Sequence, residues 1–362
     1  MRKHYLDNIR WGTVVIVVLY HVVYMYNAEG IIGVVGKITK LKVQYYDVFQ
    51  YIVYPWFMEL LFLVSGISAR YSLEKHTHKE FLRGRTRRLL VPCTVGLVCF
   101  QFLQGYVNVS LGGLFERNPN LPLPAKLFIS VLSGIGVLWY IQLLWVFSLL
   151  LVLIRNVEKD RLWSIVGKAG LTVLVSLTVP VWCAAQVLNT PIILVYRLGL
   201  YFFVFLLGYY VFSHDEVIEV LKQWFLPLLF VAAALGAAFC ICFFGQNYAD
   251  APVNRSALFT SYGWFACLAI LGGAAKYADA RNGFTEWMRL RSFGLYLFHY
   301  LGISAVGLFV AKPGLLPAPA IYLLSLAAGF GSGYLLGAVI SKLPFFRWAV
   351  MGIGNGDEKG SR

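Results

Sequence analysis

Two ionisable side chains in the first apolar segment have types and a spacing that suit chemistry inside a membrane. The segment begins Asp7-Asn8-Ile9-Arg10-Trp11 and continues through an apolar run to His21. Because eleven residues make about three α-helical turns, Arg10 and His21 share a face and lie about 16 Å apart along the axis. Arg10 would lie at the cytoplasmic interface and His21 near mid-membrane, where an ionisable group is costly and indicates a cavity or pathway. The alternatives are a structural hydrogen bond for His21 and a snorkelling anchor for Arg10.

A basic stretch after the second apolar segment is the next candidate. It reads Phe81-Leu82-Arg83-Gly84-Arg85-Thr86-Arg87-Arg88-Leu89-Leu90-Val91-Pro92. On a helix Arg85 and Arg88 would share a face, since they are three residues apart. Two neighbouring guanidinium groups suit phosphate, which arginine binds through two parallel hydrogen bonds. The alternative is a topology signal that touches lipid head groups.

Three further polar positions fall inside apolar segments. Glu59 has no basic residue nearby in sequence, and it would orient His21, bind an acceptor or pair with another helix. Arg197 would hold an anionic group, pair with Glu59 or cap helix carbonyls. His299, with Tyr296 three residues before it, would line the same cavity as His21 or hydrogen-bond between helices.

The composition predicts the elements that must position these residues. Of 362 residues 59% are apolar and only 13% are charged, against about 25% charged in a soluble domain. This excludes a soluble globular enzyme, a disordered chain and a fibrous repeat. A membrane-spanning helix needs about 20 apolar residues. We therefore predict an all-α polytopic membrane protein, a single integral membrane domain over 1–362 with no appended soluble domain. About ten transmembrane helices are expected, at 11–27, 48–69, 89–110, 132–154, 163–183, 193–212, 226–244, 256–275, 293–311 and 319–341.

The distribution of basic residues predicts the orientation. With the N-terminus inside, 23 of the 31 Lys and Arg residues fall in cytoplasmic segments, seven fall outside and Arg197 is left within a span. This asymmetry predicts a multi-pass protein of the cell membrane with both termini cytoplasmic. It also accounts for the net charge of +14 without a nucleic acid partner. The six cysteines lie in or beside apolar segments without metal-ligand spacing, so neither a disulfide framework nor a metal site is expected.

Several motifs, taken in order, resemble the acyltransferase 3 family of integral membrane acyltransferases. The resemblance covers the whole chain, and it begins with an Arg, ten residues and then a His in the first span. The stretch from Pro55 through Pro92 is most similar to the glucan-succinylating branch. The further stretches that carry the resemblance are Tyr5 to Arg10, Leu61 to Gly66, Arg85 to Arg88, Leu138-Trp139-Tyr140 and Tyr296-Leu297-Phe298-His299.

This resemblance implies an enzyme that takes an acyl group, of acetyl or succinyl type, from cytoplasmic acyl-CoA. The acceptor would be a hydroxyl of a glycan or similar molecule on the other side of the membrane. His21 would be the general base, and Glu59 would share the catalytic site. The remaining expected roles are phosphate binding by Arg85, Arg88 and Arg10, and acceptor binding by Arg197, His299 and Tyr296. Direct transfer is preferred because no nucleophile-elbow motif is present, and a transient acyl-His stays open.

A transporter is the competing interpretation. A proton-coupled carrier of an anionic or sugar solute would use His21, Glu59 and Arg197 as a relay. Such carriers often have two similar halves with broken helices at matching positions, and the sequence has neither feature. A scaffold that binds polyprenyl-linked glycans would explain neither His21 nor the two arginines of the basic stretch.

Overall fold

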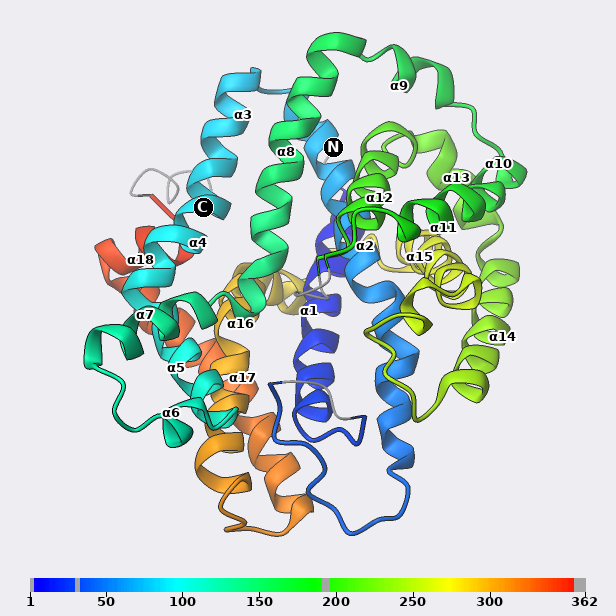
Figure 1. Ribbon diagram of the computed structural model, residues 1–362. Coiled ribbons are helices and arrows are strands. Elements are labelled where there is room, and N and C mark those ends of the chain that lie inside the picture. Colours follow the sequence, from blue (N-terminus) through cyan, green and yellow to red (C-terminus); the bar gives the residue numbers. More distant parts are fainter. Residues whose placement is uncertain (1–2, 30–32, 191–195, 355–362) are drawn as a thin grey trace. The chain divides into compact units, whose positions relative to one another are not determined.

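The computed structural model describes residues 3–29, 33–190 and 196–354, and helices dominate these ranges (Figure 1). No strand occurs among the described residues, apart from an isolated bridge between Asn189 and Arg197. The predicted all-α class is confirmed. The sixth predicted span begins at residue 193, and 193–195 lie outside the described ranges, as do Arg2, Lys359 and Arg362 of the charge count.

Within the ranges that the structure describes, eight helical segments are long and apolar enough to cross a membrane, which confirms a polytopic membrane protein. Each matches one of the ten predicted spans. Mean hydropathy is greatest in Gly136–Glu158 and Phe225–Phe243. The eight segments are His4–Met25, Tyr45–Leu73, His78–Leu111, Gly136–Glu158, Phe225–Phe243, Ala257–Tyr277, Gly283–Ala311 and Ala318–Lys342.

The two remaining predicted spans are built from shorter helices. Residues 163–183 divide among α9 (Arg161–Val166), α10 (Leu171–Ser176) and α11 (Thr178–Gln186). The break after α9 is the sequence Gly167-Lys168-Ala169-Gly170, in which two glycines and a charge oppose a continuous apolar helix. Helix α12 (Leu198–Tyr210) bends by 105° into α13 (Asp215–Gln223), so this pair adds at most one broken span. The described residues therefore contain eight spans, or nine with the bent pair, where ten are predicted.

The chain divides into two compact units. The first unit holds residues up to Thr13, Val48–Leu82 and Val146–Arg289, and the second holds Val14–Asp47, Arg83–Trp145 and the chain from Leu290. Helices α1, α3, α8 and α16 each contribute to both units. Their bounds are His4–Met25, His78–Arg85, Trp139–Glu158 and Gly283–Val306.

Close backbone contact holds the first unit together. Helix α2 (Val48–Leu73) lies against α12, and a Cβ on Gly66 or on Gly208 would overlap a backbone carbonyl of the other helix. Small residues allow this approach, which is how helices associate where no hydrophobic effect drives them. The other elements of this unit are α9 to α11, α13, α14 (Phe225–Phe243), η5 (Val253–Arg255) and α15 (Ala257–Tyr277).

The second unit is joined by buried amide and hydroxyl contacts. Helix α5 (Phe102–Leu111) is tied to α16 because Gln104 Nε2 donates to Ser304 Oγ at 2.9 Å. Gln101 Nε2 donates to the Leu297 carbonyl at 3.4 Å. The C-terminal part of α1 meets α17 (Ala318–Lys342) through Tyr26 and Ser325, whose hydroxyls are 2.7 Å apart. The other elements are η1 (Tyr45–Asp47), η2 (Thr86–Leu90), α4 (Val91–Gly96), η3 (Leu97–Gln101), α6 (Leu114–Arg117), α7 (Leu123–Ser133), η4 (Gly136–Leu138), η6 (Gly307–Ala311) and α18 (Pro344–Met351).

Candidate functional site

Two histidines from opposite ends of the chain meet in the second unit. His21 on α1 and His299 on α16 are 278 positions apart, and their Nδ1 and Nε2 atoms are 3.1 Å apart. Helix α1 is continuous, so Arg10 and His21 do occupy one helix, with His21 one turn before its end at Met25. His299 is fully buried, whereas His21 is partly exposed. The structure thus brings together two histidines that the sequence marked separately.

Backbone carbonyls hold both imidazole rings. His21 Nδ1 donates to the Val17 carbonyl at 2.9 Å. His299 Nδ1 donates to the carbonyls of Leu295 and Tyr296, each at 2.9 Å. Among the described residues no hydrogen-bond partner reaches His21 Nε2. That nitrogen is the position from which this pair can do chemistry.

Aromatic rings surround His21. The Tyr300 ring centroid lies 4.9 Å from the His21 centroid, and Tyr20 and Tyr24 lie at 5.2 and 5.9 Å. Such rings lower the local dielectric, which strengthens the hydrogen bonds of the imidazole. Tyr296, the predicted acceptor-binding residue, uses its hydroxyl to donate to the Val137 carbonyl instead. It therefore positions α16, and its hydroxyl is already committed within the protein.

Arg10 is held by α1 and α2 in the first unit. Its Nη1 is 3.2 Å from the Asp7 carboxylate, and its Nη2 donates to Ser68 Oγ and, at 3.5 Å, to the Val64 carbonyl. Its side chain keeps 35% of its exposure. Arg10 is distant in sequence from Ser65-Gly66 at the end of the second span. In the structure it contacts Ser68, which follows that pair by two residues.

Arg85 precedes a widened helical turn in the second unit, and Arg88 lies within that turn. Arg85 ends α3, and the next five residues form the π-helical segment η2, in which the Val91 N–H donates to the Thr86 carbonyl five residues back. Pro92 explains the distortion, because its ring cannot accommodate the carbonyl four residues earlier in an α-helix. Arg88 is exposed and Arg85 is partly buried. The turn differs from the α-helical face assumed from the three-residue spacing, and π turns are frequent at functional sites.

Glu59 and Arg197 lie in the first unit, both almost fully buried at 1% and 2% exposure. Neither carboxyl oxygen of Glu59 has a hydrogen-bond partner among the described residues, and Arg197 is near enough for its charge to act on this carboxyl. Arg197 donates from Nη2 to the Asn254 carbonyl at 2.6 Å and lies over the Phe259 ring. It precedes α12 as its N-terminal cap position, so it is not inside the helix that the sequence predicted around it.

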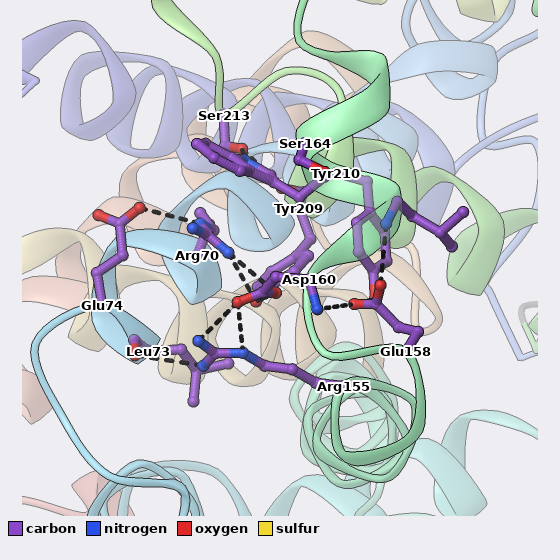
Figure 2. Close-up of polar contacts among 12 residues, drawn as sticks. Arg70, Leu73, Glu74, Arg155, Glu158, Asp160, Ser164, Tyr209, Tyr210 and Ser213 are labelled. Atoms are coloured by element: carbon purple, nitrogen blue, oxygen red, sulfur yellow. Dashed lines mark hydrogen bonds and ion pairs between the residues drawn. The ribbon is translucent and has the colours of Figure 1, made fainter.

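A group of charges that the sequence analysis missed is centred on Asp160, between α8 and α9 (Figure 2). Asp160 Oδ1 is 3.0 Å from Arg70 Nη1, and Oδ2 is 2.8 Å from Arg155 Nη2. The Tyr209 hydroxyl also donates to Oδ1 at 3.0 Å, and Arg70 pairs with Glu74 at 2.9 Å. These contacts fix a turn in which Asp160 has a φ of 59°, a left-handed conformation that aspartate tolerates better than most residues.

The same contacts alter the titration of Asp160. Burial alone would raise the pKa of its carboxyl, but hydrogen bonds from Arg155 and Tyr209 and the charges of Arg70 and Arg155 outweigh burial. The pKa of Asp160 is consequently below its ordinary value of 3.8. Sequence patterns do not reveal this group, because its members come from the end of α2, from α8 and the α8–α9 turn, and from α12. We call the set Arg70, Glu74, Arg155, Asp160 and Tyr209 the ionic cluster.

Comparison with known proteins agrees with the motifs. No curated protein and no solved structure matches the chain at a significant level. The sequence profile of the acyltransferase 3 family, described as an acyltransferase domain, matches residues 3–340. This range includes both histidines, Arg85 and Arg88, and Glu59 with Arg197. The chain therefore belongs to the acyltransferase 3 family, and it is a membrane-bound transferase of acyl groups other than aminoacyl groups.

Proposed function

We propose that this acyltransferase moves an acetyl or succinyl-type group from cytoplasmic acyl-CoA to a hydroxyl of an extracytoplasmic glycan. The observation that carries the proposal is the His21 ring. It lies in an apolar helix, its Nδ1 is held by Val17 and His299, and its Nε2 has no partner among the described residues. A partly exposed histidine with one committed and one open nitrogen is suited to proton transfer.

The donor side rests on charge. The phosphates of CoA are anionic, and Arg85 and Arg88 offer guanidinium groups beside a widened turn. Arg10 would assist, although its contacts with Asp7 and Ser68 leave fewer of its donors available. The pantetheine arm of CoA is long and uncharged, so it would carry the thioester from this basic region into the membrane-spanning helices.

A single base is sufficient for the proposed acyl transfer, because it both accepts and returns the proton. The acceptor oxygen bonds to the thioester carbonyl carbon while its proton moves to His21 Nε2. The carbon–sulfur bond then breaks, and the leaving CoA sulfur takes the proton from Nε2. The products are an ester and the free CoA thiol, and His21 is again neutral. Direct transfer needs no acyl-enzyme, although an acyl-His intermediate would use the same nitrogen.

The acceptor side is assigned to Glu59 and Arg197. A buried carboxyl with no hydrogen-bond partner is costly unless something else satisfies it. The hydroxyls of a carbohydrate are suitable partners, since they both donate and accept. Arg197 adds a positive charge beside it, which would favour an anionic acyl or acceptor group. His299 and Tyr296 use their polar atoms for hydrogen bonds within the protein, so an acceptor contact by either residue stays a prediction.

Mass spectrometry of cell-envelope glycans tests the proposal. Glycans should carry an acyl modification in cells that make the protein and lose it in cells that lack it. Cells that make His21→Ala protein, at equal membrane abundance, should resemble the cells without protein. Identical glycans in all three strains would contradict both the glycan acceptor and the role of His21.

A further inference from the structure

The two histidines form a set of contacts in which three of four partners can only accept a hydrogen bond. His299 Nδ1 faces the carbonyls of Leu295 and Tyr296, and His21 Nδ1 faces the carbonyl of Val17. The fourth contact joins the two rings, from His299 Nε2 to His21 Nδ1 at 3.1 Å. A neutral imidazole has one N–H donor and one bare acceptor nitrogen. The proton positions can therefore be derived from the contacts.

Elimination leaves one neutral arrangement. His299 must carry its proton on Nδ1, since both contacts there are carbonyl oxygens, so its Nε2 is an acceptor. His21 must then carry its proton on Nδ1, which donates jointly to the Val17 carbonyl and to His299 Nε2. The opposite tautomer of His21 would set a bare nitrogen against the Val17 carbonyl and against His299 Nε2, an arrangement with no proton in either contact. Placing a proton on both nitrogens of His299 would bury a cation, which is expensive inside a bilayer.

From this arrangement we propose that His299 is a positioning residue that fixes His21 as the tautomer whose Nε2 bears the lone pair. The inference rests on the proposed function, in which Nε2 accepts the proton of the acceptor hydroxyl. When His21 takes that proton, its Nδ1–H stays shared between Val17 and His299 Nε2, which stabilises the imidazolium. A carboxylate orients the base in Ser-His-Asp triads. A buried neutral histidine performs the orienting task here without placing a permanent negative charge in the membrane.

The surroundings keep His299 in place. Ser332 on α17 donates to the Phe298 carbonyl at 2.9 Å, one residue before His299. A Cβ on Gly302 would overlap the Ala328 carbonyl, so α16 and α17 touch along their backbones. The His299 ring is fully buried and bonded at both nitrogens. Such rigid support is what holds a base in a productive geometry.

Nitrogen NMR of purified, ¹⁵N-histidine-labelled protein in detergent gives the first test, with His21→Ala and His299→Gln samples for assignment. The proposal expects His21 protonated on Nδ1 and bare on Nε2 in the wild-type protein near neutral pH. A wild-type His21 protonated on Nε2 would overturn it, whatever the activity of any variant. The same spectrum of His299→Leu protein tests the part played by His299: a mixture of the two His21 tautomers is expected, and an unchanged Nδ1-protonated His21 would overturn the inference, because the Val17 carbonyl would then fix the tautomer alone.

Kinetics give the second test. His299→Leu should lower kcat about 10- to 100-fold with little change in the KM for acyl-CoA, and His299→Gln, whose amide oxygen can accept from His21, should restore most of it. Ser341→Ala is the matched control, because its hydroxyl donates to the Ala338 carbonyl within α17 instead of to α16, and the variant should leave kcat within about two-fold. If His21→Ala abolishes turnover but His299→Leu does not change kcat, this inference fails and the proposed function stands. If His21→Ala turns over normally, the proposed function itself fails.

Discussion

The ionic cluster of the first unit and the histidine pair of the second are both polar groups among apolar helices. They differ in how many of their polar atoms have a partner. In the cluster each oxygen of Asp160 has a cationic partner, and Arg70 also pairs with Glu74 and lies 4.1 Å from the Trp163 ring centroid. In the pair three nitrogens are bonded and the fourth, His21 Nε2, has no partner in the part of the chain that the structure describes.

The difference distinguishes polar groups that stabilise the fold from polar groups that can take part in a reaction. A polar group whose every atom is satisfied holds elements together, as the cluster does for α2, the α8–α9 turn and α12. A polar group held firmly on all sides but one is prepared to act on something else. Glu59 differs from both, since it is almost fully buried and its oxygens have no hydrogen-bond partner among the described residues. Substitutions in the three places should therefore differ in which property they change.

The largest expected effect is on turnover at the histidine pair. His21→Ala should lower kcat about 10³-fold, because a positioned general base contributes roughly 10²- to 10⁴-fold. The unfolding temperature and the affinity for acyl-CoA should change little, since the ring is partly exposed. His76→Ala, which removes an exposed histidine, is the control for kcat. A His21→Ala protein with near-normal turnover would contradict this comparison, because His21 Nε2 would then have no role in the reaction.

Asp160→Ala should give the largest loss of stability. Removing the carboxylate leaves Arg70 and Arg155 near each other without their common partner, and breaking such a pair costs about 3 kcal/mol. Turnover per folded molecule should remain normal. Glu219→Ala is the control, since its partner Lys222 is at the surface, and exposed pairs contribute at most about 1 kcal/mol. Denaturant titration in detergent measures both, and equal losses would show that the cluster is not structural.

Glu59→Leu should change stability in the opposite direction. An unsatisfied buried polar group costs about 1–3 kcal/mol, so an apolar side chain of similar size should raise the free energy of unfolding by part of that amount. Acyl transfer should fall in the same variant, because the acceptor would lose its carboxyl partner. Ser325→Ala, which leaves the buried Tyr26 hydroxyl without its partner, should be destabilising by contrast. A destabilised Glu59→Leu protein would mean that Glu59 has a structural partner.

Substitution of Arg85, the last residue of α3 before the η2 turn, should affect binding alone. Removing a charge-assisted phosphate contact costs roughly 1.5–3 kcal/mol, so Arg85→Ala should weaken acyl-CoA binding by about ten-fold or more. Isothermal titration with a non-hydrolysable acyl-CoA analogue measures this loss. Lys79→Ala, an exposed charge on the same α3 helix, should bind as the wild type does. An unchanged dissociation constant for Arg85→Ala would contradict phosphate binding and would favour the alternative, in which the basic stretch is a topology signal.

The smallest expected effect is the pH dependence of the ionic cluster. Since the pKa of Asp160 is lower in the folded protein than its ordinary 3.8, the folded state favours the ionised form. The resulting stability is fully present above that ordinary value and is lost as pH falls through the lowered folded pKa. The difference in unfolding temperature between wild type and Asp160→Asn should therefore be constant above about pH 5 and shrink below pH 4. A difference that grows on acidification would contradict this pairing.

Local patterns in the sequence were sufficient to predict the fold class. Eight of ten predicted spans are single long helices, because a continuous apolar run of sufficient length has few alternatives in lipid. They failed at 163–183 and 193–212, where the structure has short helices and a 105° bend. A hydropathy window averages over helix-breaking residues such as Gly167 and Gly170. It therefore predicts one long helix where the structure has separate short helices.

The arrangement of the site was less predictable than its members. His21 and His299 were each identified as candidates because they lie within apolar segments. The contact between them spans 278 positions and depends on how α1 and α16 pack. The π turn at Thr86–Leu90 depends on Pro92, which the three-residue spacing of Arg85 and Arg88 ignored. Asp160 was not singled out in the sequence, since two of its partners, Arg70 and Tyr209, lie 90 positions before it and 49 after it.

Transfer of an isotopically labelled acyl group by purified protein in detergent tests the central claim most directly. Labelled acyl-CoA is incubated with the protein and a hydroxyl-bearing glycan, and the glycan and the free CoA thiol are then quantified. We expect labelled ester and free thiol in equal amounts, without any sealed compartment, and neither product with His21→Ala. A wild-type protein that forms no labelled ester in detergent across acetyl and succinyl donors would contradict direct transfer at His21. If the same protein moves a solute across sealed vesicles, it is a carrier instead.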